Sequence, residues 1–528
     1  MSIKKRILAV AAASALGAMA AVPAMAFENE FHGSYTLKYF LSNYEQGGGG
    51  IILPSASTTT TGTGVSGNTT ANLKTNNYFE QRARLFYTAK ANDDLKLVTG
   101  FEIDSVWGDR AQGNTYRNSG AALESDAVNL ETKWVYLQFK IPSTPTTVIA
   151  GVQPFKDNLK GIFADFDAAG VVTSTKMDNA TVVAGYFRGY DGAFGGSLTT
   201  NSSTGTNVSG TTNGVSKSGI LGNQDLNIGA LEFKYALNKD ANIGLDYYVY
   251  EDGRNTNLNT TAVPVTASDL LVHVVGLYGD AKVGPVALSG FAAYQGGVVR
   301  SINGSADSAY LNSLAYNVAA KAAVGPGTLH SALLFTSGNG SNPGKHLTGW
   351  VGTTQTQGAT SNGTAVWNNA GGNGTCSYNE SGMMLLNRNA LSQGTTSDYG
   401  IAYNTGNGTN PVNAQGMYLY TLGYDLSITP KAYVNTNVGF LWAAHNNALK
   451  PTDKSITSGS FQNASNFQGT EINVETGYKM YDNLTAKLQA AYVILGGYYK
   501  NSVYKAGTTG AADPDNPYTA RIVLSYAF

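Results

Sequence analysis

The stretch Tyr518-Thr-Ala-Arg-Ile-Val-Leu-Ser-Tyr-Ala-Phe528 decides the fold of this chain. Every second residue from Tyr518 to Phe528 is apolar or aromatic, whereas the residues between them are smaller and more polar. This alternation predicts a β-strand with one face in an apolar medium. A strand of this length, tilted by about 40°, rises about 25 Å, which is the height of the apolar band of a membrane-spanning β-barrel. The stretch therefore predicts a barrel strand with aromatic residues at both edges of that band.

The beginning of the chain has the features of a secretory signal peptide. Three cations at positions 4–6 precede an apolar run that ends at the small-residue site Ala24-Met-Ala26. We therefore expect residues 1–26 to be cleaved and the mature protein, 27–528, to be exported. No later segment is apolar over the ~18 residues that a membrane helix needs. If the chain enters a membrane, it must do so as a barrel.

Composition agrees with an all-β membrane protein. Charged residues make up 13% of the chain, about half the ~25% of soluble domains. Glycine, with 63 residues, and tyrosine, with 32, are abundant, as in alternating strands joined by polar loops. Some secreted β-sandwich arrays would have the same composition, so composition alone does not decide. The formal net charge of −1 becomes −4 without the three cations of the signal peptide. A charge this small predicts no nucleic-acid partner.

The reactive residue types show no arrangement that supports catalysis or cofactor binding. Cys376 is the only cysteine, which excludes an internal disulfide framework and c-type haem attachment. The five histidines are scattered without metal-ligand spacing. No Ser-His-acid arrangement is present. We therefore expect no enzyme activity, no metal and no cofactor.

The chain reads as a series of hairpins in which alternating segments meet at tight turns and long polar loops join one hairpin to the next. Eighteen strands are expected, although sixteen remain an alternative if one pair is misassigned. They are 31–41, 78–90, 94–104, 128–141, 146–153, 168–176, 181–190, 225–236, 242–251, 268–283, 286–297, 312–324, 328–337, 417–428, 432–445, 469–480, 484–497 and 518–528.

The faces of the strands predict which side meets water. In 94–104 the odd positions are mostly apolar, while Lys96, Glu102 and Asp104 share the other face. Charges on alternate positions of several strands indicate an aqueous interior. The short turns would lie at the periplasmic end and the long loops outside, including the very long segment 338–416.

The third external loop differs from the others. Residues 154–167, Pro-Phe-Lys-Asp-Asn-Leu-Lys-Gly-Ile-Phe-Ala-Asp-Phe-Asp, are denser in apolar residues and carry Asp157, Asp165 and Asp167. With its signal peptide, its terminal strand and this loop, the chain resembles the general diffusion porins of Gram-negative outer membranes. In those proteins the third loop folds into the lumen, narrows it, and presents carboxylates to a ladder of arginines.

The resemblance implies a cell outer membrane location, a single barrel domain and passive diffusion of small hydrophilic solutes and ions. It also implies a homotrimer, contact with outer-membrane lipid and lipopolysaccharide, and insertion by the barrel assembly machinery. The terminal residues Tyr526 and Phe528 resemble the assembly signal of such barrels. General porins usually have sixteen strands, so eighteen would be a departure.

If the resemblance applies, the wall opposite the acidic loop should be basic. In 78–90 the odd positions are mostly apolar and face lipid, so Arg82 and Arg84 face the lumen. We expect a transverse field between this wall and the loop carboxylates, which would orient dipolar solutes. The same residues could instead line a solvated wall or pin the loop. The same alternation places four further basic residues on the inward face of neighbouring strands. They are Lys38, Lys96, Lys487 and Arg521.

Two other functions remain open. The barrel could sheathe an electron-transfer cytochrome complex, which would require an unobstructed lumen. It could also be a surface adhesin or receptor that binds ligands through the loop 338–416, although that loop has few aromatic residues that could anchor a partner.

Overall fold

The structure is a computed structural model. It describes residues 28–45, 75–108, 121, 130–190, 225–256, 268–301, 308–340, 344–353, 378–387, 401, 415–446, 449–450, 460–461, 465–500, 503–504 and 511–528. The expected signal peptide and Cys376 lie outside these residues.

Eighteen long antiparallel strands form one sheet, so the expected strand number is confirmed. The bounds lie within a few residues of those expected, because the alternation and the turn residues mark each strand. The strands are β1 (Glu28–Ser42), β2 (Asn76–Asn92), β3 (Leu95–Val106), β4 (Leu130–Lys140), β5 (Thr146–Lys156), β6 (Asp165–Met177), β7 (Ala180–Tyr190), β8 (Leu226–Asn238), β9 (Ala241–Thr256), β10 (Ser268–Val283), β11 (Val286–Ser301), β12 (Ala309–Val324), β13 (Gly327–Thr336), β15 (Met417–Ser427), β16 (Ala432–Ala443), β19 (Phe467–Tyr481), β20 (Leu484–Leu495) and β23 (Tyr518–Ala527).

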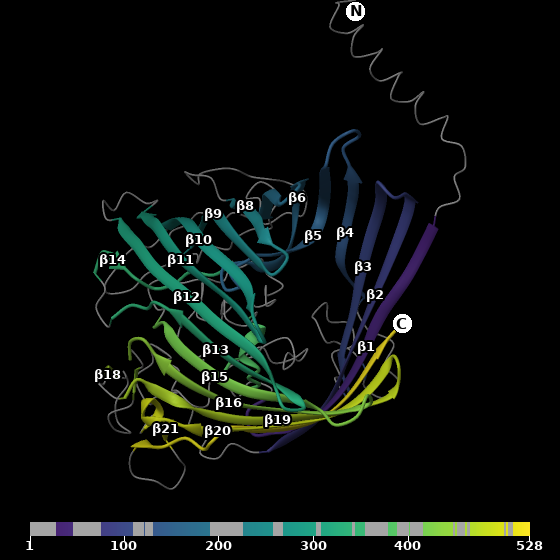
Figure 1. Cartoon of the computed structure of the whole chain (residues 1–528). Coiled ribbons are helices and arrows are strands. Elements are labelled where there is room, and N and C mark those ends of the chain that lie inside the picture. Colours follow the sequence, from purple (N-terminus) through teal and green to yellow (C-terminus); the bar gives the residue numbers. More distant parts are fainter. Residues whose placement is uncertain are drawn as a thin grey trace, which may run out of the picture.

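The sheet closes on itself. Each long strand pairs with its neighbour in the chain, and β1 pairs with β23 in a register that sets Tyr35 opposite Tyr526 and Ser42 opposite Thr519 (Figure 1). The two-residue strand β14 (His346–Leu347) adds a short parallel pairing to β12. Closure removes the free edges that an open sheet would expose in a membrane.

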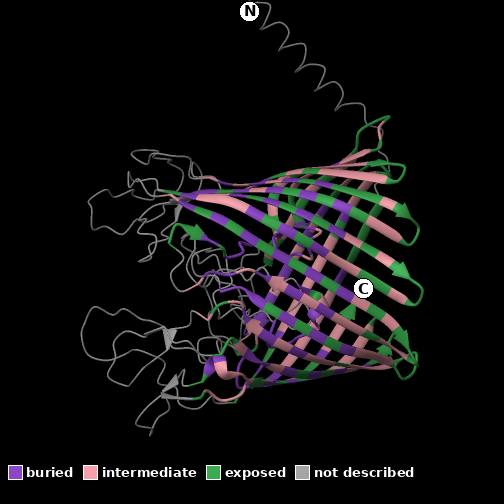
Figure 2. Ribbon diagram, turned by 60° about the vertical axis from the view of Figure 1, so that its left-hand side comes forward, coloured by how far each residue is buried: buried purple, intermediate pink, exposed green. Residues whose placement is uncertain are grey.

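The outer surface of the barrel is apolar. Along β12 the exposed residues Tyr310, Leu314 and Val318 alternate with buried ones, and Figure 2 shows the same alternation on neighbouring strands. A closed antiparallel barrel with an apolar outer band is the form in which β-strands cross an outer membrane. The chain is therefore an outer-membrane β-barrel. Among the described residues, no helix has the length and apolar character needed to cross a membrane.

The inside of the barrel has two different sides. On β1 to β4 the inward positions are largely charged or polar, as the alternation indicated. On β10 the inward residues Leu270, Val272 and Val274 are fully buried and apolar. Segments 157–164, 344–353 and 378–387 pack against that side and join it in one apolar cluster. The described inward residues are therefore polar along one side and apolar along the other, whereas the alternating charges had indicated an aqueous interior without this apolar side.

Candidate permeation site

The β5–β6 hairpin leaves the barrel wall at its outer end. The pairing of β4 with β5 stops at Val152, and the pairing of β6 with β7 stops at Ala169. The two strands stay paired with each other as far as Lys156 and Asp165. The tip of the hairpin is therefore attached to neither neighbouring strand, and it turns into the barrel (Figure 1).

Two glycines allow this departure. Gly151 has a φ of +133°, a conformation that side chains disfavour, and a Cβ there would lie 2.3 Å from the carbonyl oxygen of Val135. Gly170 lies opposite Gly151, and a Cβ on it would lie 2.4 Å from the Phe187 ring. The sequence therefore permits a close approach of backbone and ring that no other residue type would allow.

One face of the hairpin packs onto the inner wall. The ring of Phe155 lies 4.9 Å from that of Phe187 on β7, and the ring of Phe163 lies 5.2 Å from that of Tyr248 on β9. Leu159 fills the space beside Gly276 of β10, where a Cβ would come within 2.6 Å of it. These apolar contacts hold the hairpin inside the barrel.

Asp157 organises the tip of the hairpin. It is 4% exposed, and its carboxylate accepts hydrogen bonds from the backbone N–H groups of Gly161, Phe163 and Ala164. Burial raises the pKa of Asp157 to about 7, and the nearby Glu232 adds to this increase while the three amides oppose it. The side chain therefore shapes the loop and does not present its charge to the lumen, unlike the position expected for it.

A second inward segment, 344–353, is joined to the hairpin. Trp350 Nε1 donates to the carbonyl oxygen of Ile162 at 3.2 Å. The Thr353 hydroxyl donates to the carbonyl oxygen of Phe163 at 2.8 Å. The same segment is fixed to the wall because the Gln295 side chain donates to the Val351 carbonyl and accepts from its N–H.

A third inward segment, 378–387, covers the wall beyond it. The Glu471 carboxylate of β19 accepts hydrogen bonds from the backbone N–H groups of Met384, Leu385 and Leu386. Lys160 at the hairpin tip pairs with Glu380 of this segment at 2.8 Å. The three segments thus form one body that fills one side of the barrel.

The opposite wall carries a ladder of ion pairs. Lys38 of β1 lies 4.0 Å from Glu80 of β2. Arg82 donates two hydrogen bonds of 2.7 Å to Asp104 of β3, and Arg84 donates one of 2.5 Å to Glu102. The basic side chains are 12–35% exposed, whereas their acidic partners are at most 2% exposed. The wall therefore presents cations to the lumen that carboxylates behind them largely neutralise.

The other residues expected on the basic wall have different surroundings. Arg521 is buried and pairs with Glu45, so it is closed off from the lumen. Lys96, near the turn end of β3, lies opposite Gln138 of β4. Lys487 of β20 lies opposite Val523 of β23. Of the expected basic residues, Lys38, Arg82 and Arg84 are thus the ones that form the ladder of ion pairs.

The second face of the hairpin meets this wall. Asp165 and Asp167 lie within β6, not in the connecting loop. Asp167 accepts a 2.6 Å hydrogen bond from Lys133 Nζ and one of 2.7 Å from Trp134 Nε1, both on β4. Asp165 is on the same face of β6 and pairs with Lys156 at 2.8 Å. The hairpin therefore meets the β1–β4 wall inside the barrel at charged residues of both signs, and the roles of these residues as a constriction remain a prediction.

Sequence reasoning missed Lys133, Trp134 and the segment 378–387. The run Met383-Met-Leu-Leu386 stands out in a Gly/Asn/Thr-rich loop, and it could have indicated a buried segment. The apolar residues on the inward face of β10 were a second signal that a segment packs against this wall. Among the described residues, no group of three potential metal ligands occurs.

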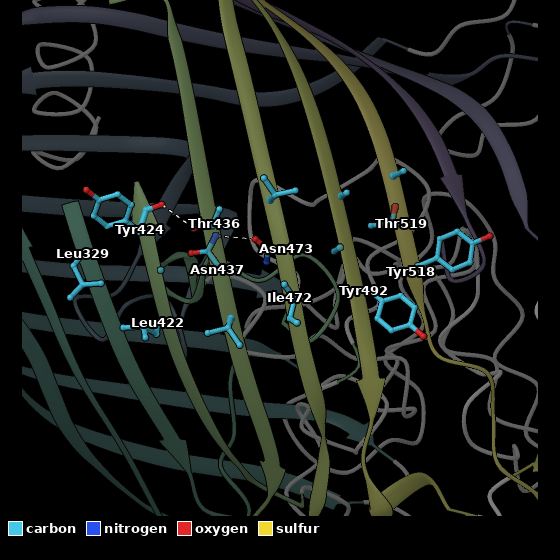
Figure 3. Close-up of a pocket in the computed structure, with 16 residues that line it drawn as sticks. Leu329, Leu422, Tyr424, Thr436, Asn437, Ile472, Asn473, Tyr492, Tyr518 and Thr519 are labelled. Carbon is cyan, nitrogen blue, oxygen red and sulfur yellow. Dashed lines mark hydrogen bonds between the residues drawn. The ribbon is translucent and has the colours of Figure 1, made fainter. Parts of the chain in front are cut away.

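A depression of about 760 Å³ lies elsewhere, on the lipid-facing surface of the barrel. It crosses β13 to β23 and is lined by outward residues, among them Leu422, Ile472 and Tyr492 (Figure 3). Because it faces lipid, it is not part of the passage through the barrel.

Comparisons with protein-family models and with curated proteins gave no match. Solved structures similar in fold include OccAB1 of Acinetobacter baumannii, with 10% identity over 95% of this chain and 96% of that one and a TM-score of 0.45. OccK1 (OpdK) of Pseudomonas aeruginosa shares 11% identity over 94% and 98%, with a TM-score of 0.47. OpdQ of P. aeruginosa shares 12% identity over 95% and 98%, with a TM-score of 0.45. Likeness at this level bears on the fold alone.

Proposed function

We propose that the chain is an outer-membrane porin, a water-filled channel through which small hydrophilic solutes and ions diffuse passively. The observation that carries the proposal is the set of charged residues of both signs where the inward β5–β6 hairpin meets the β1–β4 wall. Charged side chains on a lumen wall need water or partners, because an isolated charge in an apolar interior is very costly. A narrow passage lined by both signs of charge admits polar solutes and penalises apolar ones.

The inward segments argue against the cytochrome sheath. A sheath must enclose a partner protein along its length, but 157–164, 344–353 and 378–387 occupy one side of the interior and are fixed there by hydrogen bonds. Two of these segments, 344–353 and 378–387, make up most of what the structure describes of 338–416. This leaves less of that loop for an adhesin surface.

Selectivity between cations and anions should be weak. Arg82, Arg84 and Lys133 each have a carboxylate within 2.7 Å. Paired charges of opposite sign produce a much smaller field in the lumen than a row of cations would. We further propose, from the resemblance to porins, that the protein is a homotrimer in contact with lipopolysaccharide.

The test is to reconstitute the purified protein in planar bilayers and record single channels in asymmetric KCl. Steady openings would support the porin, closure in three equal steps would support the trimer, and the reversal potential would give the ion preference. A correctly folded barrel that never conducts would reject passive diffusion. Asp165→Asn and Arg82→Gln should then move the reversal potential in opposite directions.

A further inference from the structure

Three aromatic rings form a continuous stack on the lumen side of the β1–β4 wall. The His32 ring lies 5.3 Å from that of Phe86, and the Phe86 ring lies 4.9 Å from that of Trp134. Phe86 and Trp134 meet across β3 because the residue between them is Gly100, where a Cβ would lie 3.0 Å from Phe86 and 3.3 Å from Trp134. We call Phe86 and Trp134 the aromatic platform.

The platform is open to the lumen. Phe86 and Trp134 are half-buried and His32 is exposed, whereas Phe187 and Tyr248 on the filled side of the barrel are fully buried. Aromatic rings that served only as core would be covered like the second pair. The part of the two rings that their neighbours leave uncovered therefore faces the inside of the barrel, beside Lys133 Nζ, which lies 5.8 Å from the centre of the Trp134 ring.

Hydrogen-bonding groups of both kinds border the platform. Arg84, with 35% of its side chain exposed, is two residues from Phe86 on the same face of β2. Asp167, with 23% exposed, is hydrogen-bonded to Trp134 Nε1. A solute lying on the rings could thus accept hydrogen bonds from the guanidinium at one edge and donate to a carboxylate at the other.

We propose that the aromatic platform, with Arg84 and Asp167, is a subsite for the ring of a neutral sugar. The proposal rests on the proposed channel function and names the solute class that the passage favours. One face of a sugar ring carries C–H groups, which lie favourably on the negative face of an aromatic ring. Its hydroxyl groups need both donors and acceptors, which the two edges of the platform supply.

The charges beside the platform favour a neutral solute over an anion. Arg84 is bonded to Glu102, and Lys133 to Asp167. An anion on the platform would meet those carboxylates as well as the cations, so its net attraction would be small. The hydroxyl groups of a neutral polyhydroxylated solute can donate hydrogen bonds to the carboxylates and accept hydrogen bonds from the cations.

The experiment measures the block of ion current by added solutes in planar bilayers. The probes are glucose and maltose, with sorbitol as a hydroxylated solute that lacks a ring and gluconate as its anionic counterpart. The proposal expects the two sugars to reduce the KCl current at lower concentrations than sorbitol and gluconate. Trp134→Ala and Phe86→Leu should raise the half-blocking sugar concentration between about twofold and tenfold, the range expected for lost ring contacts.

Two controls separate stacking from structural damage. Trp134→Phe keeps a ring and loses the bond to Asp167. Its half-blocking sugar concentration should therefore lie closer to that of the wild type than the value for Trp134→Ala does. Trp442→Ala removes an outward tryptophan of β16 and should leave sugar block unchanged. If a conducting wild-type channel shows no preference for the sugars, or if both platform variants keep it, the sugar subsite is rejected while the channel stands. If the wild type does not conduct, the channel function itself fails.

Discussion

Gly151 and Gly170 lie opposite each other in the register of β5 and β6, one residue before the last residues of the hairpin that pair with the neighbouring strands, Val152 and Ala169. The departure of the hairpin from the wall thus depends on two residues without side chains. An ordinary β-barrel would continue both strands into an external loop. Here the same two strands deliver Asp165 and Asp167 to the inside of the barrel.

Gly170→Ala should destabilise the barrel and displace the hairpin. The added Cβ would lie 2.4 Å from the Phe187 ring and 2.5 Å from the Tyr186 carbonyl oxygen, and overpacking of this kind costs about 1–3 kcal/mol. The midpoint of denaturant unfolding, followed by loss of the compact form on gels, checks this. Gly229→Ala on β8, whose Cβ would have no neighbour nearer than 3.9 Å, is the matched control. Equal midpoints for the two variants would contradict the packing described here.

Arg82→Gln should shift the channel toward cations. The substitution removes a cation that makes two 2.7 Å bonds to Asp104, whose side chain is 1% exposed. Removal of one partner of a buried ion pair costs about 3–5 kcal/mol. We therefore expect lower stability together with a more cation-selective reversal potential. Arg82→Lys, which keeps the charge without the paired geometry, should lose stability with a much smaller change in selectivity.

The sequence predicted the strands of the barrel well, but it did not predict the segments that pack inside the barrel. Strand number and facing follow from local alternation, which β23 shows most clearly, and closure follows from the need to pair every strand. The position of the third loop was expected from the resemblance to porins. Its departure as a paired hairpin was not, because the contacts of Gly151 and Gly170 involve neighbours that only the fold brings together.

The candidate site was predictable only where it depends on the alternation of residues along the strands. The alternation along 78–90 placed Arg82 and Arg84 on the inward face, and the structure has both on the inner wall of the barrel. The alternation could not show that Arg521 is buried against Glu45 or that Asp157 bonds to its own loop, because both depend on loop conformation. Whether these residues act in permeation remains a prediction.

The stability of the hairpin should fall as pH rises from about 4 to 7. Asp157 has its pKa raised from 3.8 to about 7, so the folded state binds more protons than the unfolded state in this range. Its stabilising contribution is therefore complete below pH 4 and is lost as pH rises through the folded pKa. Two other carboxyl groups, Glu232 of β8 and Asp246 of β9, lie near it, together with the Tyr248 hydroxyl.

Unfolding temperatures of the wild type and Asp157→Asn at pH 5 and pH 8 test this dependence. The wild type should unfold at a lower temperature at pH 8, and the variant should show a smaller difference between the two. Asp165→Asn removes a carboxyl from the other face of the hairpin and should keep the wild-type difference. An unchanged dependence in Asp157→Asn would assign the titration to Glu232 or Asp246.

Glu471→Ala should release the inner segment 378–387 from the wall. The Glu471 carboxylate is fully buried and accepts from three successive backbone amides, Met384 to Leu386. A hydrogen bond to a charged acceptor contributes roughly 1.5–3 kcal/mol, so hydrogen exchange at these amides should accelerate by about tenfold or more. Glu475→Ala removes another buried carboxylate of β19, bonded to Tyr433 and Gln489 and not to the segment. It should leave exchange at 384–386 unchanged, and faster exchange in both variants would mean that loosening of β19, and not the lost acceptor, frees the segment.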